Sequence, residues 1–242
     1  MIRSLNTVNK NMNILQKKQE NTSANMANVK TPGYKFQDIV QSTIESKVMV
    51  NYAGGIEGDR RQELGRFVFE NRIDDYYRNF EQGTLIETGN NNDFAIIGNG
   101  FFTIQLDNGQ LGYTRNGNFK VNEENKLVTI DGAPVLVVDE FGQQSSFFIE
   151  NNVVSNINFL ISDFADYQNL VSQGNTVFTA GVGQAEFIKG EVKQGFLESS
   201  NVDIADELVK MIEIAREFES NQKLLHTADE TLNKAVNEIG RV

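Results

Sequence analysis

Apolar residues recur at spacings of three and four along the N-terminal 30 residues, which is the period of an α-helix. The series is Ile2, Leu5, Val8, Met12, Leu15, Thr22, Met26 and Val29, with Gln19 in its one gap. Lys, Asn and Gln occupy most of the other faces, and such a narrow stripe is typical of a coiled-coil seam. Pro32 disfavours helical backbone in the residue before it and Gly33 permits a turn, so the helix should end near Lys30.

The C-terminal 40 residues repeat this pattern more strongly. The series is Ile204, Leu208, Met211, Ala215, Phe218, Gln222, Leu225, Asp229, Leu232, Val236 and Ile239. Ser200 and Asp203 have the spacing of a capping box, so the pattern predicts a helix over 202–239. A helix of this length with a narrow seam needs a partner to be stable, although packing on its own domain is an alternative.

Residues 66–191 consist of short β-type runs separated by turn sequences such as Asp107-Asn108-Gly109, Asn116-Gly117 and Asp131-Gly132. The predicted strands are 94–97, 101–106, 111–114, 119–121, 126–130, 135–138, 147–150, 156–160 and 177–180. This spacing favours an antiparallel sandwich or a barrel-like domain. Residues 37–65 contain a Gly-rich stretch and form an ambiguous connector.

The predicted fold class is therefore α+β, with long N- and C-terminal helices forming a coiled-coil-like layer and one central all-β domain. We expect residues 1–36 and 196–242 to form a discontinuous helical assembly domain, residues 37–65 to connect it, and residues 66–195 to form the β domain.

The charge of the chain excludes some functions and suggests a contact between its ends. The net charge of -11 argues against nucleic-acid binding, which requires clustered Lys and Arg. Residues 1–35 hold six basic residues and one acidic residue, whereas residues 196–242 hold five basic and ten acidic residues. The two ends thus carry opposite charge, which suggests that they meet within one chain or between chains.

Candidate chemistry is sparse. Because the chain has no Cys and His226 is its one His, the usual zinc, copper and iron sites cannot form, and we expect no metal and no cofactor. Asp74-Asp75 and Glu123-Glu124 are acidic pairs of the kind that serve glycosidases, but adjacent strand residues point to opposite faces. Gly98-Asn99-Gly100 leads into a strand and not into the helix N-terminus that a phosphate loop needs. We therefore expect no catalytic residue and no enzyme.

Three segments carry a resemblance to a known family. The N-terminal segment 25–35 matches the pattern N-[IL]-A-N-x-x-T-x-G-[FY]-K at Asn25, Ala27, Asn28, Thr31, Gly33, Tyr34 and Lys35, with Met26 in place of the usual Ile or Leu. The C-terminal matches are Gly195, Glu198, Ser200, Asn201, Val202, Met211, Ile212, Arg216, Phe218 and Glu219. Together with residues 98–102 and 113–119, these segments resemble the rod and hook family of bacterial flagellar axial proteins.

The resemblance implies a basal-body rod subunit, either the distal one or a similar proximal one, since the chain has room for about one β domain. It implies assembly through the terminal helices into a torque-transmitting tube across the cell envelope, outside the cytoplasmic membrane. The implied partners are copies of the chain, other rod and hook proteins, and the flagellar type III export apparatus, with no nucleic acid and no membrane insertion. Export without a cleaved signal peptide agrees with the polar N-terminus.

The expected assembly interface combines the two series with the two motifs. Its residues are Leu5, Val8, Met12, Leu15, Asn25, Met26, Asn28, Thr31, Gly33, Tyr34, Asn201, Val202, Leu208, Met211, Ile212, Ala215, Phe218, Leu225, Leu232, Val236 and Ile239. The competing hypothesis is a self-contained binding module, whose β domain is displayed on an intramolecular helical hairpin.

Overall fold

The structure, a computed structural model, describes residues 2–43, 47–52, 61–67, 71–138, 144–146, 157–174, 176–180 and 185–239. The chain divides into two compact units. Unit 1 comprises Met1–Ala24, Gln37–Tyr77 and Ala205–Val242, and unit 2 comprises Asn25–Phe36 and Arg78–Ile204. Each unit is therefore assembled from segments that lie far apart in the sequence.

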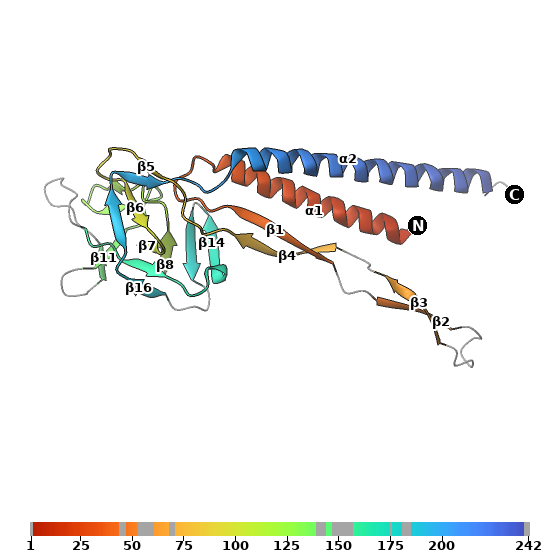
Figure 1. Cartoon of the computed structure of the whole chain (residues 1–242), viewed down its shortest axis with the longest axis horizontal. Coiled ribbons are helices and arrows are strands. Elements are labelled where there is room, and N and C mark those ends of the chain that lie inside the picture. Colours follow the sequence, from red (N-terminus) through yellow and green to blue (C-terminus); the bar gives the residue numbers. More distant parts are fainter. Residues whose placement is uncertain are drawn as a thin grey trace. The chain divides into compact units, whose positions relative to one another are not determined.

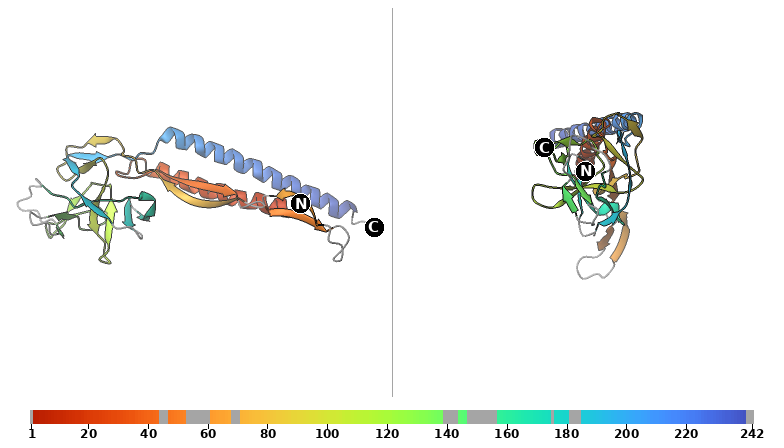
Figure 2. Two further views of the ribbon diagram at one scale, coloured as in Figure 1. Left: turned by 60° about the horizontal axis from the view of Figure 1, so that its bottom comes forward. Right: turned by 90° about the vertical axis from the view of Figure 1, so that its left-hand side faces the viewer.

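Unit 1 contains nearly all of the two terminal helices. The N-terminal helix α1 spans Ile2–Ala27. The C-terminal helix α2 spans Ile204–Lys234 and continues as a π-helix over Ala235–Ile239. The two helices run side by side in opposite directions (Figures 1 and 2). No helix within the described ranges is both long enough and apolar enough to cross a bilayer.

The α+β class and both terminal helices are present, but the predicted coiled-coil-like layer is wrong. Along α2, the predicted positions Leu208, Ala215, Gln222 and Asp229 are exposed. The residue before each of them is buried or half-buried instead, namely Glu207, Ile214, Asn221 and Ala228. The inner face of α2 therefore keeps Met211, Phe218, Leu225 and Leu232 but replaces the other predicted positions by their neighbours, of which Glu207 and Asn221 are polar. Within the described residues, the apolar seam predicted along α2 is thus interrupted.

The segment interpreted as a connector contains β-strands. Strand β1 (Gln37–Thr43) pairs with β4 (Asn71–Arg78), and β2 (Lys47–Tyr52) pairs antiparallel with β3 (Arg61–Phe67). These strands lie almost entirely in unit 1 with the helices. The prediction that one central domain holds the β structure therefore needs correction. The Gly-rich stretch at Gly54, Gly55 and Gly58 lies outside the described residues.

Unit 2 is built on a six-stranded sheet in the order β14-β15-β8-β7-β13-β16, in which every pair is antiparallel. Its strands are β7 (Phe101–Gln105), β8 (Leu111–Thr114), β13 (Ile161–Asp163), β14 (Leu170–Gly174), β15 (Val177–Ala180) and β16 (Glu186–Ile188). A 3-10 helix spans Tyr167–Asn169 between β13 and β14. The hairpin predicted around residues 107–109 is confirmed by the pairing of β7 with β8.

Smaller two-stranded pairs complete unit 2. These are β5 (Leu85–Glu87) with β18 (Phe196–Glu198), β6 (Phe94–Ile97) with β17 (Glu191–Gln194), β9 (Lys120–Val121) with β10 (Leu127–Val128), and β11 (Leu136–Val138) with β12 (Gln144–Ser146). Residues 157–160 join no regular strand, although Phe159 forms a single bridge with Val137. The predicted strand 147–150 and residue 156 lie outside the described part of the chain.

Two aromatic clusters fill unit 2, on opposite faces of β7. Phe102 and Ile104 pack into one cluster and Phe101 into the other, because successive strand residues point to opposite faces. The first cluster also contains Phe94, Phe119, Leu127, Val135 and Phe159, and the second contains Tyr113, Phe164, Leu170 and Phe178. Strand β7 is covered on both sides, which makes unit 2 the packed part of the molecule.

Candidate assembly surface

The two terminal motifs meet within unit 2. The backbone N–H of Gly33 donates a hydrogen bond to the carbonyl of Glu198 at 2.8 Å, and the N–H of Phe36 donates to Asn201 Oδ1 at 2.7 Å. Asn201 Nδ2 donates in turn to the carbonyls of Asn79 and Glu81, at 3.0 and 3.1 Å. The side chain of Asn201, expected at the start of α2, thus bonds to two other segments of the chain.

The N-terminal motif is held together by its own side chains. The Tyr34 hydroxyl donates to Asn25 Oδ1 at 3.0 Å, and the Thr31 hydroxyl donates to Asn28 Oδ1 at 3.1 Å. These bonds fold the chain back at the end of α1, close to where the sequence predicts that the helix ends. Asn25 is buried, so this motif residue acts within the chain.

Gly33 is the tightest point of this turn. Its φ of +70° lies in the left-handed region that favours glycine, and a Cβ placed there would lie 2.4 Å from the backbone nitrogen of Asn116. A side chain at this position would therefore separate the N-terminal motif from residues 115–116.

A buried ion cluster lies where the motifs meet. Lys35 Nζ is 2.6 Å from Glu198 Oε1, and Arg115 Nη1 is 3.3 Å from Glu198 Oε2. The side chains of Lys35 and Glu198 are each 1% exposed, and that of Arg115 is 3% exposed. We call these three residues the Glu198 cluster. Burial lowers the pKa of both Lys35 and Arg115, and the Glu198 carboxylate opposes that lowering by stabilising the two charged forms.

Further groups complete the surroundings of the cluster, and Glu81 and Asp163 add electrostatic attraction for Lys35 and Arg115, respectively. Lys35 Nζ donates to the carbonyl of Glu81 at 2.6 Å, and the N–H of Gly83 donates to Glu198 Oε1 at 3.0 Å. Arg115 donates to the carbonyl of Gly98 at 2.8 Å and lies over the ring of Phe101, 5.2 Å from its centroid. The expected interface omitted all three residues of the cluster. Lys35 and Glu198 both lie in motifs and carry opposite charge, which was the available clue.

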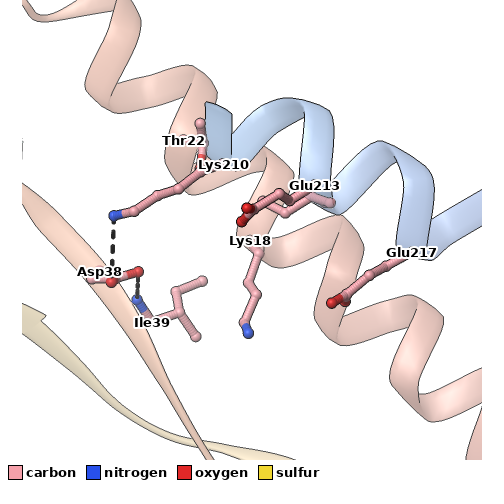
Figure 3. A pocket seen from close by; sticks show the side chains of 8 residues that line it. Lys18, Thr22, Asp38, Ile39, Lys210, Glu213 and Glu217 are labelled. Carbon is pink, nitrogen blue, oxygen red and sulfur yellow. Dashed lines mark hydrogen bonds and ion pairs between the residues drawn. The ribbon is translucent and has the colours of Figure 1, made fainter. Parts of the chain in front are cut away.

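Unit 1 has a charged pocket of about 220 Å³ between α1, β1 and α2 (Figure 3). Lys210 Nζ lies 3.6 Å from Asp38 Oδ2 and 3.2 Å from the buried Glu207 Oε1. The other lining residues are Lys18, Thr22, Ile39, Glu213, Ile214 and Glu217. A basic residue of α1 therefore shares a pocket with acidic residues of α2, and Lys35 pairs with Glu198. Both arrangements agree with the opposite charges of the two ends.

The helical residues of the expected interface fall into two groups. Leu15 is buried, and Leu5, Val8, Met12, Met26, Met211, Phe218, Leu225 and Leu232 are half-buried. Leu208, Ile212, Ala215 and Val236 are exposed, while Val202 is buried in unit 2 and the side chain of Ile239 lies outside the described residues. Of the motif residues, Gly33 is buried and Asn28, Thr31, Tyr34 and Asn201 are half-buried.

An apolar strip lies on the first turns of α2. Leu208, Val209 and Ile212 are 44%, 55% and 54% exposed. They are neighbours on the helix surface because residues three and four apart share a face. We call these three residues the α2 strip. Exposed apolar side chains gathered in this way are typical of a surface that a partner covers.

The candidate catalytic groups do not converge. Asp74 and Asp75 are exposed on β4, Glu124 pairs with Lys126 at 2.8 Å, and His226 lies on the surface of α2, 3.4 Å from Glu230. In the part of the chain that the structure describes, no group of three acidic or His residues is placed to hold a metal ion.

Comparisons with known proteins give a consistent result. A family model described as "Flagellar basal body rod FlgEFG protein C-terminal" matches residues 193–238, and one described as "Flagellar hook protein FlgE/F/G D1 domain" matches residues 95–162. The chain is 33% identical to the flagellar basal-body rod protein FlgG of Borreliella burgdorferi, over 98% of both chains. It is 30% identical to FlgF of Caulobacter vibrioides over 94% of both chains, and 31% identical to FlgG of Bacillus subtilis over 98% of this chain and 99% of that protein.

Proposed function

Because the chain belongs to the family of flagellar basal-body rod proteins, we propose that it polymerises through its terminal helices into a helical tube that transmits torque. It is a structural subunit of the flagellum, in a family of structural proteins and not of enzymes. Its location is the flagellar basal body, where other rod and hook proteins are its partners. Self-association and passage through the type III export apparatus without a cleaved signal are parts of the proposal.

The observation that carries the proposal is the α2 strip. Covering three adjacent apolar side chains that are exposed in the isolated molecule is favourable, so the strip favours contact with a neighbour. A polymer provides that neighbour in every repeat, since each subunit presents the same surface to the next. We assign assembly to the terminal residues 1–36 and 196–242.

The buried and exposed members of the expected interface contribute in different ways. The exposed residues Leu208 and Ile212 are proposed to touch neighbouring subunits directly. Buried motif residues such as Asn25 and Gly33 contribute by fixing the segments that lead into and out of the helices. A substitution of a buried residue should therefore impair folding, whereas a substitution in the strip should impair assembly alone.

Ile212→Glu tests this division. A carboxylate within the α2 strip should leave unfolding of the purified monomer within about 0.5 kcal/mol of wild type, because the site is exposed there. It should prevent incorporation into basal bodies of a host that lacks its own copy, because burying an unpaired charge at the contact is costly. Incorporation is measured by immunoblot of purified basal bodies, together with swimming.

Ser220→Glu is the matched control, since it adds the same charge at an exposed polar position of α2. It should incorporate normally. Wild-type incorporation of Ile212→Glu would exclude the strip as an assembly contact. Limited proteolysis of the dilute monomer addresses the binding-module alternative, because a closed helical hairpin would protect the terminal segments as strongly as the β strands.

A further inference from the structure

Three chain segments of unit 2 converge on one carboxylate. They are residues 33–36, at the end of the N-terminal motif, residues 79–84, which follow β4, and residues 198–201, which precede α2. We infer that Glu198 locks these three segments together, so that the end of α1 and the start of α2 are fixed only when this carboxylate is in place. The inference concerns the isolated chain and does not depend on the proposed assembly.

Glu198 bonds to the other two segments through both its side chain and its backbone. Its Oε1 accepts from Lys35 Nζ at 2.6 Å and from the N–H of Gly83 at 3.0 Å, so one oxygen holds the first two segments. Its own carbonyl accepts from the N–H of Gly33 at 2.8 Å. Because Glu198 belongs to the third segment, all three are joined at a single residue.

Backbone contacts show how closely the segments approach. The N–H of Ser199 donates to the carbonyl of Thr84 at 2.8 Å, and the N–H of Asn79 donates to the carbonyl of Phe36 at 2.9 Å. A Cβ on Gly83 would lie 2.0 Å from the carbonyl oxygen of Ser199. Such proximity excludes water from the cluster, so its charges depend on one another for compensation.

Charge balance singles out Glu198 among the three residues. Two cations, Lys35 and Arg115, pair with this one carboxylate, and Glu81 and Asp163 add only a weaker electrostatic attraction. Replacing Lys35 leaves Arg115 and Glu198 as a balanced pair. Replacing Glu198 instead leaves two buried cations close together, and neither keeps its salt bridge. Removing one partner of a buried pair strongly destabilises the site, because the remaining charge loses its compensation. Loss of Glu198 should therefore separate the segments more than loss of Lys35.

The experiment is hydrogen–deuterium exchange of the full-length protein, with strand β7 (Phe101–Gln105) as internal reference. Glu198→Gln keeps the shape of the side chain and should accelerate exchange of the amides of Gly33, Phe36 and Ser199 by about 100-fold or more. Lys35→Met should accelerate the same amides by about tenfold. Exchange in β7 should remain at the wild-type rate in both variants, because the expected opening is local.

Glu191→Gln is the matched control, since it removes an exposed carboxylate from β17 in the same C-terminal segment. It should exchange like wild type throughout. Wild-type exchange in Glu198→Gln, or equal acceleration in β7 and in the three segments, would overturn the inference. If Glu198→Gln does not fold, Lys35→Met carries the test, and unchanged exchange at Gly33 and Phe36 in that variant would overturn it.

Discussion

Around Glu198, three charged side chains are buried and each has an oppositely charged neighbour inside the same unit. Along the first turns of α2, the three apolar side chains of the α2 strip lie in solvent, as does Ile204 before them. Both arrangements reverse the usual distribution, in which charge is outside and apolar surface is inside. They occur close together in the sequence, since Glu198 precedes Leu208 by only ten residues.

The difference lies in where the compensating partner is found. A buried carboxylate without a cation would unfold its surroundings, so the partners of Glu198 must come from the same chain. An exposed apolar side chain can remain uncovered at a smaller cost until another molecule arrives. The cluster therefore completes the fold of the subunit, and the strip leaves part of its surface for assembly.

The largest expected effect concerns the turn that delivers Lys35 to the cluster. Gly33→Ala should destabilise unit 2 by about 3 kcal/mol, because left-handed backbone is unfavourable for Ala and its Cβ would meet the backbone of Asn116. Denaturant unfolding followed by near-ultraviolet circular dichroism of the Tyr and Phe rings measures it.

Gly89→Ala separates the cost of the left-handed backbone from the cost of the steric contact. Gly89 has a φ of +68°, almost the same as that of Gly33, but a Cβ there would meet nothing within 4 Å. Its substitution should cost about 1 kcal/mol, from the backbone conformation alone. Equal losses at the two glycines would mean that the N-terminal motif does not need its close contact with residues 115–116.

An intermediate effect is expected at the edge of the second aromatic cluster. The Tyr167 hydroxyl donates to Asp163 Oδ1 at 2.6 Å, and burial together with this bond raises the pKa of Tyr167 to about 12. The unfolded chain should lose this proton near pH 10 and the folded chain only near pH 12. The raised pKa of Tyr167 thus adds its full contribution to the free energy of unfolding below pH 10, and this contribution is lost as the pH rises from 10 to 12.

Unfolding of wild type and Tyr167→Phe at pH 9 and pH 11.5 measures that loss. Between the two pH values, the free energy of unfolding of the wild type should fall by on the order of 1 kcal/mol more than that of the variant, after allowance for the partial exposure of the ring. Parallel losses would mean that the packed region of unit 2 does not shield its polar groups, which would weaken the contrast with α2.

The sequence predicted the parts of this fold that depend on local pattern. Strands 94–97, 111–114 and 177–180 have the predicted bounds, because short apolar runs lie between turn residues. The seam of α1 also agrees with burial at Leu15 and Thr22. Strands β1 to β4 escaped prediction because charged residues interrupt their alternation, even though a Gly-rich stretch separates β2 from β3.

Tertiary pairing explains what the sequence could not predict. On α2, Glu207 is buried beside Lys210 while Leu208 is exposed, and hydrophobicity alone would reverse these positions. Lys35 and Glu198 were both visible within motifs, but they are 163 residues apart and only the folded chain pairs them. Burial of paired charge depends on distant partners, so a periodic pattern cannot reveal it.

The smallest expected effect tests whether burial, rather than pairing, gives Glu198 its role. Asp38 also pairs with a lysine, Lys210 at 3.6 Å, but its side chain is 50% exposed. Asp38→Asn removes that charge and keeps the Oδ1 that accepts from the N–H of Ile39. It should change the free energy of unfolding by less than about 0.5 kcal/mol, because solvent already screens the pair. Denaturant unfolding of Asp38→Asn and Glu198→Gln compares the same change, a carboxylate to an amide, at an exposed and at a buried position. A similar loss of unfolding free energy in both variants would show that exposure does not distinguish the two lysine–carboxylate pairs.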